Sequence, residues 1–323
     1  KIERFLPLPH GGITKTPGTQ FMGEVKDSSK ITRLIRFIFS TVQAYQIEFG
    51  DLYCRFYISG GLVESSPGVP LEVVTPYTQS DLADIQFVQS ADIIFLVHPN
   101  HAPRKLSRTA PTTWTLTTYD NVDGPYLDAN ITTTTLTPSA TTGSVTITAS
   151  SIVGINNGVG FRASDVGRWI RMQHSTTWGW AKITAFTDTT HVTALVSSAF
   201  GAATAVSKWN LGAWSSDLGF PRTIAFYEDR LFFGGNANLP QTIWGTKSGD
   251  YYLFSPSDAN STVTDDNGVV YGLASGQVND IRWLDSTKIL VAGTASAEFS
   301  ISGGTNNDAL TPTNIRAFAA TVR

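Results

Sequence analysis

The chain has 323 residues, of which 41% are hydrophobic, so it can bury one large core or two. Only 15% of the residues are charged, whereas 11% are aromatic and 28 are glycine, and this balance predicts a β-rich fold with many turns. A formal net charge of −3 at pH 7 excludes the strongly basic surface with which nucleic-acid-binding proteins hold phosphates.

The single cysteine, Cys54, excludes an internal disulfide and any zinc site built on several cysteines. Apolar runs such as residues 93–97 are far shorter than the roughly 18 residues that span a bilayer, so no membrane span is predicted. The chain begins at Lys1 without a methionine and ends at Arg323 inside a strand-like segment, which predicts a fragment of a longer protein.

Internal repeats are visible along the chain. Four segments open with an aliphatic residue and an aromatic residue two positions later: Ile35 and Phe37, Ile85 and Phe87, Ile224 and Phe226, Ile281 and Trp283. The second and third agree further when they are counted from Asp92 and from Asp229. The matching residues are Phe95 and Phe232, Pro103 and Pro240, Leu106 and Ile243, Trp114 and Tyr251, Leu116 and Leu253. Recurrence at a fixed spacing is the signature of a repeat fold.

Each repeat contains short runs in which apolar residues alternate with polar ones, separated by Gly, Pro, Asn or Ser, and such runs predict strands. Successive repeats begin about 50 to 57 residues apart, somewhat longer than the roughly 40 to 50 residues of common β-propeller blades. The step from residue 85 to residue 224 is about 139 residues, and removing an insert of roughly 85 residues returns it to about 54.

The insert, residues 127–210, has a composition of its own. It begins with a threonine-rich stretch from Thr132, whose β-branched side chains favour extended backbone. Four alternating runs follow, at residues 144–148, 169–172, 178–184 and 191–196. They predict a separate small β-barrel or β-sandwich.

The alternative for the insert is a disordered, threonine-rich loop, against which Trp169, Trp178 and Trp180 argue because large aromatic side chains are seldom left unburied. We therefore predict an all-β fold with a propeller-like body. Its blades occupy residues 1–126 and 211–323, and the inserted small β-barrel occupies residues 127–210.

Two histidines, His98 and His101, are near enough in sequence to suggest a shared metal ion. Two histidines three residues apart can bind one metal ion when they lie on the same face of a helix. Pro99 and Pro103 forbid a helix here, so a turn between strands is predicted. The remaining histidines lie in unrelated segments: His10, His174 and His191. No metal site and no cofactor are predicted.

The run Ser215-x-Asp217-x-Gly219 is similar to the turn box of sialidase-type propellers, although the Thr-Trp that should follow is missing. Such a box caps a hairpin through bonds from side chain to backbone and is no active site. A glycosidase would need two carboxylates at a fixed separation, whereas the acidic residues here mostly occupy turn contexts. No catalytic residue is predicted, and the chain is not expected to be an enzyme.

Other short motifs favour structural roles. The glycine-rich residues 11–19 lack the order of a phosphate-binding loop. Cys54 lies in an alternating strand-like run, where a packed thiol is expected rather than a nucleophile. Asn130 and Asn260 begin two glycosylation-acceptor triplets, which matter only in a eukaryotic secretory setting.

A set of motifs in a fixed order resembles the tail nozzle and head-to-tail connector proteins of short-tailed bacteriophages. The motifs before the insert are Gly11-Gly-Ile-x-x-x-Pro-Gly-Thr19, Leu34-Ile-Arg-Phe-Ile-Phe39, Tyr45-Gln-Ile-Glu-Phe-Gly50, Arg55-Phe-Tyr57, Thr75-Pro-Tyr77 and Phe87-Val-Gln-Ser-Ala-Asp92. Those after it are Asp229-Arg-Leu-Phe-Phe-Gly234, Trp244-Gly-Thr246 and Leu310-Thr-Pro-x-Asn-Ile315. The insert resembles the small β-barrel of ubiquitin-activating enzymes, without their chemistry because it contains no cysteine.

The resemblance implies a structural virion protein of the phage tail. Six identical subunits would form a ring that DNA crosses without sequence-specific binding, and the outer surface would contact neighbouring tail proteins or fibres. The net charge of −3 agrees with such a conduit, since a channel for DNA must not hold phosphate tightly. The alternative is a carbohydrate-binding or glycan-degrading propeller at the virion tip, with Trp178 and Trp180 as exposed platforms for sugars.

Overall fold

The computed structural model describes residues 5–16, 18, 21, 23–40, 43–273, 279–304 and 308–322. The chain divides into two compact units, Lys1–Gln79 and Ser80–Arg323. Both are built from strands, and the helical segments of the described ranges are two 3-10 turns, η1 (Asn156–Gly158) and η2 (Ala163–Asp165). The predicted all-β fold is confirmed. Across the described part of the chain, no helix has the length and apolar character needed to cross a membrane.

The first unit contains one five-stranded antiparallel sheet and two small ribbons. In the sheet, β3, β4 and β5 follow one another, and β6 and β9 both pair with β5. Ile35 and Phe37 lie on the buried face of β3, because side chains alternate between the two faces of a strand. The strands are β1 (Phe5–Pro7), β2 (Ile13–Lys15), β3 (Arg33–Ile38), β4 (Ala44–Gly50), β5 (Tyr53–Ile58), β6 (Gly61–Leu62), β7 (Glu64–Ser66), β8 (Val69–Pro70) and β9 (Glu72–Val74).

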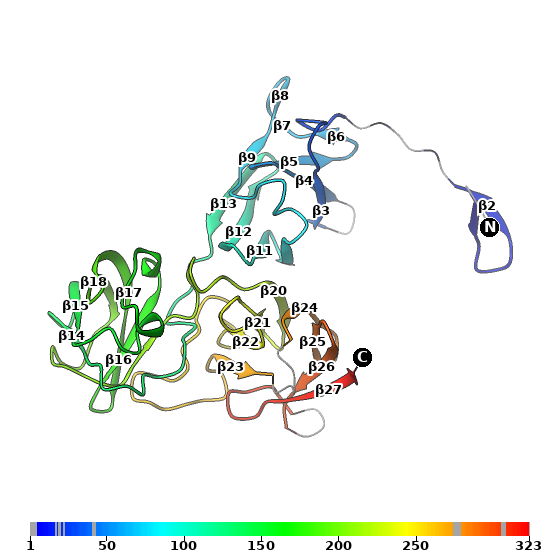
Figure 1. Ribbon diagram of the computed structural model, residues 1–323. Helices are drawn as coiled ribbons and strands as arrows, with labels where there is room; N and C mark the ends of the chain where they lie inside the picture. Colours follow the sequence, from blue (N-terminus) through cyan, green and yellow to red (C-terminus); the bar gives the residue numbers. More distant parts are fainter. Residues whose placement is uncertain are drawn as a thin grey trace. The chain divides into compact units, whose positions relative to one another are not determined.

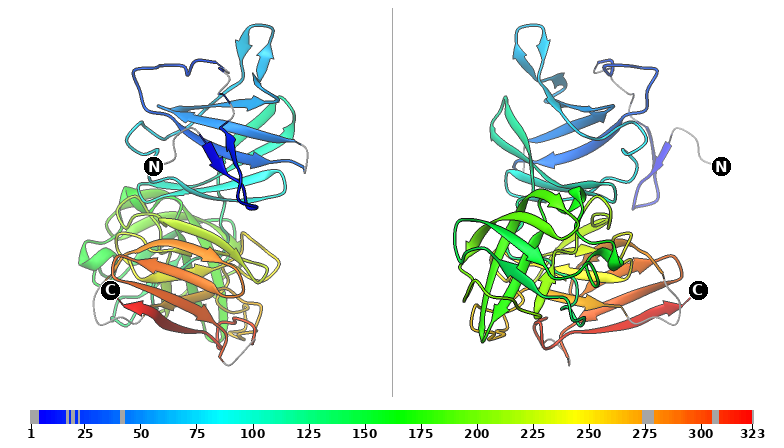
Figure 2. Two further views of the ribbon diagram at one scale, coloured as in Figure 1. Left: turned by 90° about the vertical axis from the view of Figure 1, so that its right-hand side faces the viewer. Right: turned by 60° about the vertical axis from the view of Figure 1, so that its left-hand side comes forward.

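Three sheets of the second unit are four-stranded antiparallel meanders, which is the form of a propeller blade (Figure 1). The first is β10 (Gln86–Ser90), β11 (Ile93–His98), β12 (His101–Ala110) and β13 (Thr113–Thr118). The second is β20 (Thr223–Tyr227), β21 (Arg230–Gly234), β22 (Thr242–Gly245) and β23 (Val269–Gly272). The third is β24 (Ile281–Ser286), β25 (Leu290–Thr294), β26 (Ala297–Ser302) and β27 (Arg316–Val322), drawn orange to red in Figure 2.

The first strands of these sheets come together, as the inner strands of propeller blades do. β20 contacts both β10 and β24. The Ser286 hydroxyl on β24 donates to the carbonyl of Phe226 on β20 at 2.6 Å. The side-chain amide of Gln86 on β10 donates to the carbonyl of Arg282 on β24 at 2.8 Å. The unit is therefore partly propeller-like.

Apolar clusters fill the spaces between consecutive sheets. Phe95 of β11 lies in the cluster shared with Phe233 and Trp244 of the next sheet. Phe232 of β21 lies in the following cluster, with Phe299 of the third sheet. Both Phe95 and Phe232 are buried, at 3% and 0% exposure, and they occupy equivalent places in successive interfaces.

The hairpin turns fix how the repeats align. Two residues connect β10 to β11 and β20 to β21, and Asp92 and Asp229 take the second position in each turn. Turn length sets strand register. The alignment counted from these aspartates therefore matches residues that occupy equivalent positions in the two sheets. The match of the opening pairs is wrong by two residues, since Phe87 is equivalent to Ile224 and not to Phe226.

The insert forms a six-stranded sheet, drawn green in Figure 1, in the order β14-β15-β18-β17-β16-β19. Leu136 exchanges two backbone hydrogen bonds with Val206, at 2.9 and 3.0 Å, which brings the two edges of the sheet together as a partly closed barrel. Its core is an apolar cluster of its own. The strands are β14 (Leu136–Pro138), β15 (Ser144–Ala149), β16 (Trp169–His174), β17 (Thr177–Asp188), β18 (His191–Ser198) and β19 (Trp209–Leu211).

The alternative of a disordered threonine-rich loop is wrong, because that stretch contains β14 and the buried Thr134. The insert leaves and rejoins the body at adjacent points, where the Leu127 N–H donates to the Leu211 carbonyl at 2.9 Å. The division between compact units lies at residues 79 and 80. The domain boundaries at 126/127 and 210/211 stay predictions.

Replacing Phe232 by alanine should lower the free energy of unfolding by about 3–5 kcal/mol, because it removes a buried aromatic ring from a well-packed interface. Phe95→Ala should cost a similar amount, since the two rings are equivalent. Phe318→Ala is the control, with a side chain 57% exposed, and should change stability by less than about 0.5 kcal/mol. Urea unfolding measures all three, and a difference above about 2 kcal/mol between the two buried positions would contradict their equivalence.

Deleting residues 128–210 and joining Leu127 to Leu211 through a short Gly/Ser linker should leave a body that unfolds cooperatively. The joined ends are already hydrogen-bonded neighbours, so the linker closes a small gap at little entropic cost. Thermal unfolding followed by near-UV circular dichroism makes the measurement, with the separately expressed insert as the companion sample. Loss of the cooperative transition in the shortened chain would show that the insert is part of the body's core.

Candidate functional site

The predicted turn box precedes β20. The Leu218 N–H donates to Ser215 Oγ at 3.1 Å, and Ser215 and Gly219 form a β-bridge. Gly219 has φ +81°, and a Cβ at this position would lie 3.0 Å from Ala237. Glycine is therefore required at this turn, and the box is a folding device, as expected from the sequence.

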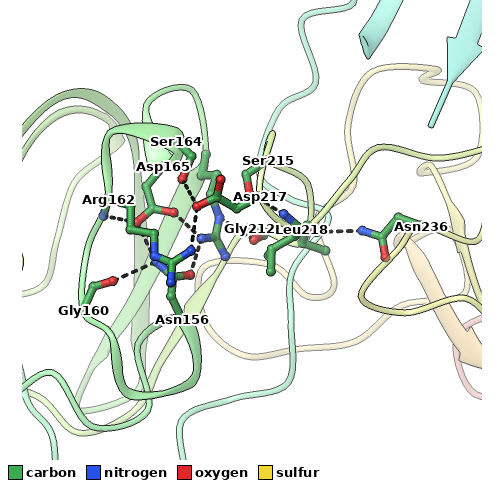
Figure 3. A network of polar contacts seen from close by, with 12 residues as sticks. Asn156, Gly160, Arg162, Ser164, Asp165, Gly212, Ser215, Asp217, Leu218 and Asn236 are labelled. Atoms are coloured by element: carbon green, nitrogen blue, oxygen red, sulfur yellow. Dashed lines mark hydrogen bonds and ion pairs between the residues drawn. The ribbon is translucent and has the colours of Figure 1, made fainter. Parts of the chain in front are cut away.

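The third box residue, Asp217, reaches from the turn to the insert (Figure 3). Its Oδ2 accepts hydrogen bonds from Arg162 Nη1 at 2.8 Å and from Ser164 Oγ at 2.7 Å. The bond from Arg162, followed by that from Ser164, holds the pKa of Asp217 below its usual value. Both ionic partners are substantially exposed, so this contact positions η2 against the body more than it stabilises the fold.

A buried ion pair lies beside this contact. Arg168 and Asp165 are 3% and 1% exposed, and the guanidinium donates to the Asp165 carboxylate. It also donates to Asn156 Oδ1 at 2.7 Å and to the Gly212 carbonyl at 2.8 Å. Because Gly212 lies on the segment that leaves the insert, one buried guanidinium joins η2 to the point where the insert rejoins the body.

A second buried ion pair joins the insert to the body through β16. Arg171 Nε lies 3.8 Å from Asp123 Oδ1, and both side chains are almost completely buried. Arg171 Nη2 donates to the Ser257 carbonyl at 2.8 Å, in the body. The Asp123 carboxylate accepts from the hydroxyls of Tyr126 and Ser255, each at 2.6 Å. Burial raises the pKa of Asp123, and the nearby Arg171 opposes that change.

Trp178 and Trp180 pack on this arginine and not in the barrel core. The Arg171 guanidinium carbon lies 4.9 Å from the Trp178 ring centre and 5.4 Å from that of Trp180. The backbone N–H of Trp178 donates to the Ala259 carbonyl at 2.7 Å, and the Trp178 side chain is only 8% exposed. Trp178 is therefore not the exposed sugar platform that the carbohydrate hypothesis requires.

A cleft of about 310 Å³ lies where the insert meets the blades. Its aromatic lining comes from Tyr119, Trp169, Trp214 and Phe220. Arg168 and Lys182 also line it, and each has an acidic partner, Asp165 and Asp120 respectively. This cleft joins elements from both sides of the junction.

Three metal-ligating side chains meet at the turn between β11 and β12. His101 Nε2 lies 3.1 Å from Asp81 Oδ2, and His98 Nε2 lies 3.7 Å from Asp81 Oδ1. The predicted turn is confirmed, because β11 ends at His98 and β12 begins at His101. Sequence reasoning missed Asp81, which lies before β10 and is brought to the histidines by the fold.

The protonation of His98 bears on metal binding. The Asn100 N–H donates to His98 Nδ1 at 3.1 Å, so in the neutral ring Nδ1 is the acceptor and Nε2 carries the proton. A metal-bound histidine normally donates its other ring N–H instead. Coordination through Nε2 would reverse that arrangement, so the geometry fits a His101–Asp81 hydrogen bond with His98 in electrostatic contact better than a metal centre. Burial is the main cause that lowers the pKa of His98.

The other candidates have structural positions. Burial raises the pKa of the Cys54 thiol, which disfavours the reactive thiolate. The Asn130 side-chain amide donates to the carbonyls of Thr132, Thr134 and Ser207 at 3.1, 3.0 and 2.9 Å, so it holds the start of the insert. Asn260 is exposed.

The remaining sequence candidates do not converge. Of the glycine-rich residues 11–19, Pro17 and Thr19 lie outside the described residues, and Lys15 lies in the exposed ribbon of β1 and β2. His174 Nε2 contacts the Thr204 carbonyl at 3.0 Å, and His191 pairs with Asp188 at 2.9 Å in an exposed hairpin. The absence of catalytic, cofactor and metal residues stays a prediction.

The buried arginines were not singled out from the sequence. The signal that could have identified them is a charge in an otherwise apolar strand: Arg168 and Arg171 flank Trp169 and Ile170, all of them buried. A charge at a core-like position is uncommon without a buried partner. The partners lie far away or in turns, so they could not be assigned from spacing.

Comparison with known proteins adds little. No protein-family model matches the chain, and no curated protein matches it. Among solved structures, the crystal structure of the computationally designed Ika8 protein is 12% identical, with a TM-score of 0.20 over 87% of this chain and 85% of that one. A likeness at this level carries no argument about fold or function.

Replacing Arg171 by methionine should lower the free energy of unfolding by about 3–5 kcal/mol, because the Asp123 carboxylate then remains buried without its counter-charge. Lys208→Met is the matched control: Lys208 Nζ lies 5.4 Å from the same Trp178 ring but is exposed, so its loss should cost less than about 1 kcal/mol.

The loss in free energy of unfolding caused by Arg171→Met, its stability deficit, should depend on pH. Without the guanidinium, the pKa of Asp123 rises further above its unfolded value, so the folded state binds the proton more tightly and gains stability as the pH falls. Denaturant unfolding at pH 7 and at about pH 5 should show the deficit shrinking at the lower pH. An unchanged deficit, or an equal loss for Lys208→Met, would contradict the role given to Asp123.

Proposed function

We propose that this chain is a structural protein of a bacteriophage virion, a subunit of the tail nozzle or head-to-tail connector ring through which DNA leaves. The observation that carries the proposal is the ordered set of motifs that resembles those proteins. It is supported by a partly propeller-like fold in which two motif residues lie on strands of blade-like sheets, Phe87 on β10 and Phe232 on β21.

The junction between insert and body also suits a structural role. Two buried guanidinium groups, from Arg168 and Arg171, cross that junction with several hydrogen bonds each. Displacement of the insert would break these bonds and leave a charge buried and unpaired, which disfavours sliding. We propose a homo-oligomeric ring of six subunits in the phage tail, which carries no enzyme activity or cofactor and contacts adaptor proteins or fibres on its outer surface.

A carbohydrate-binding or glycan-degrading propeller at the virion tip remains the second candidate. The cleft at the junction has aromatic residues in its lining, but Trp169 and Trp214 are only 5% and 8% exposed, and Trp178 at 8% offers no exposed platform either. Incubation of the protein with host surface polysaccharide, followed by an assay for new reducing ends, distinguishes the candidates. Release of reducing ends would overturn the structural proposal.

Assembly gives the direct test. The protein released from particles should be a closed cyclic oligomer with a central channel wide enough for duplex DNA, because identical heterologous interfaces close into a ring after a fixed number of subunits. Native mass measurement and averaged electron micrographs along the symmetry axis supply the subunit number and the channel. A monomer, or an open filament in particles, would contradict the nozzle assignment.

A further inference from the structure

The sequence contains two asparagine–glycine pairs, Asn157-Gly158 and Asn267-Gly268. In such a pair the glycine has no side chain, so its backbone nitrogen approaches the preceding asparagine side chain without steric hindrance. Asparagine is thermally labile because this approach leads to loss of its amide group. The two pairs have the same chemistry, but the structure gives them different surroundings.

The pair Asn267-Gly268 is protected by burial and by hydrogen bonds. Asn267 is only 3% exposed, and its Oδ1 accepts from the Thr264 N–H at 2.7 Å and from Thr264 Oγ1 at 3.0 Å. The Gly268 N–H, which would supply the attacking nitrogen, donates to the Ser255 carbonyl at 2.8 Å. Reaction at this pair would first require several buried groups to separate, which costs a large opening free energy.

The pair Asn157-Gly158 lies in the 3-10 turn η1. The Asn157 side chain is exposed and makes no hydrogen bond within the described part of the chain. The turn holds Asn157 in the left-handed region, at φ 58° and ψ 35°, which a residue with a side chain adopts at a cost. The Gly158 N–H donates to the Ile155 carbonyl at 3.0 Å, and the neighbouring bond, from the Val159 N–H to the Asn156 carbonyl, is 3.4 Å long. Because a short exposed turn opens at little free-energy cost, the Gly158 nitrogen can rotate toward the Asn157 side chain.

We propose that Asn157 is a site of spontaneous deamidation, with water as the only co-reactant. The Gly158 backbone nitrogen gives its proton to a solvent base and bonds to the Asn157 side-chain carbonyl carbon, and ammonia leaves with a proton returned from solvent. Water then opens the cyclic succinimide at either of its carbonyls. One opening gives aspartate at position 157, the other gives isoaspartate, and no group is oxidised or reduced. This inference does not depend on the nozzle assignment.

Isoaspartate carries the main chain through the side-chain carbon and so adds one backbone atom to η1. The residues on either side of the turn have little room to move. Ile155 is fully buried in the core of the insert. Gly160 is packed so closely that a Cβ there would lie 2.4 Å from the Thr189 carbonyl oxygen. The extra atom must therefore displace the residues between these two points.

One of these residues is Asn156, which belongs to the polar network at the junction (Figure 3). Its Oδ1 accepts from Arg168 Nη1 at 2.7 Å, and its Nδ2 donates to Asp165 Oδ2 at 2.8 Å. Isoaspartate at position 157 should weaken both bonds and so destabilise the junction. Ordinary aspartate at that position adds only an exposed charge, which changes stability little.

The test incubates the whole folded chain in mildly alkaline buffer, which speeds removal of the proton from the Gly158 nitrogen. Peptide mapping by mass spectrometry measures conversion at each asparagine, and a protein isoaspartate methyltransferase labels the isoaspartate product. We expect Asn157 to convert about tenfold faster than Asn267, or more, because the two sites differ in opening free energy. In concentrated guanidinium chloride, where neither site is protected, the two rates should be similar.

Asn157→Gln is the matched control. Glutamine keeps an exposed amide but must close a larger ring, so this variant should form no isoaspartate at position 157 and should match the unaltered chain at every other asparagine. A smaller rate advantage for Asn157, or no conversion of Asn157 in the folded chain, would overturn the proposal.

The effect on the junction has its own measurement. Ion exchange separates the deamidated chains from the unreacted chain, and their thermal midpoint is compared with that of Asn157→Asp, which has the same charge and an ordinary backbone. We expect a lower midpoint for the deamidated chains, in which isoaspartate is the main product. Equal midpoints would show that η1 accommodates the extra atom, and would refute the link to the junction.

Discussion

The body of this protein depends on the need of each β-sheet to cover its two faces. A four-stranded meander cannot bury both alone, so consecutive sheets share an apolar interface, as Phe95 and Phe232 do in two successive ones. Within a sheet, a large side chain also requires a small neighbour, and Gly245 of β22 is the cross-strand partner of Phe232 of β21. A Cβ on Gly245 would lie 2.6 Å from the Phe232 ring, so the absence of a side chain there makes room for the aromatic anchor.

The insert is attached by a different kind of interaction. Its own core is apolar and closed, whereas its junction with the body uses the buried guanidinium groups of Arg168 and Arg171. Buried ion pairs add little net stability compared with apolar packing, but they are intolerant of misplacement. The ion pairs and hydrogen bonds of these guanidinium groups therefore fix how the insert is placed on the body. The apolar clusters on either side of the junction supply the stability.

The sequence predicted the fold class and the strands well, because alternation along runs such as residues 144–148 depends on local burial alone. It also indicated the repeat. The opening pair at Ile224 was aligned two residues out of register, because only the hairpin turn fixes which residues of the two repeats are equivalent. The junction could not be predicted: Arg171 meets Asp123 and Ser257 through chain folding, and no spacing relates them. Asp81 reaches His98 and His101 for the same reason.

The adjacent entry and exit of the insert have a mechanical consequence. When the body is pulled along its chain, the load can pass directly from Pro125 to Ala213, whose backbone groups are hydrogen-bonded at 2.8 Å, and from Leu127 to Leu211. These short links shield the barrel from tension until they break. The barrel then holds a reserve of hidden chain length, which would be released only after the links at its base have given way.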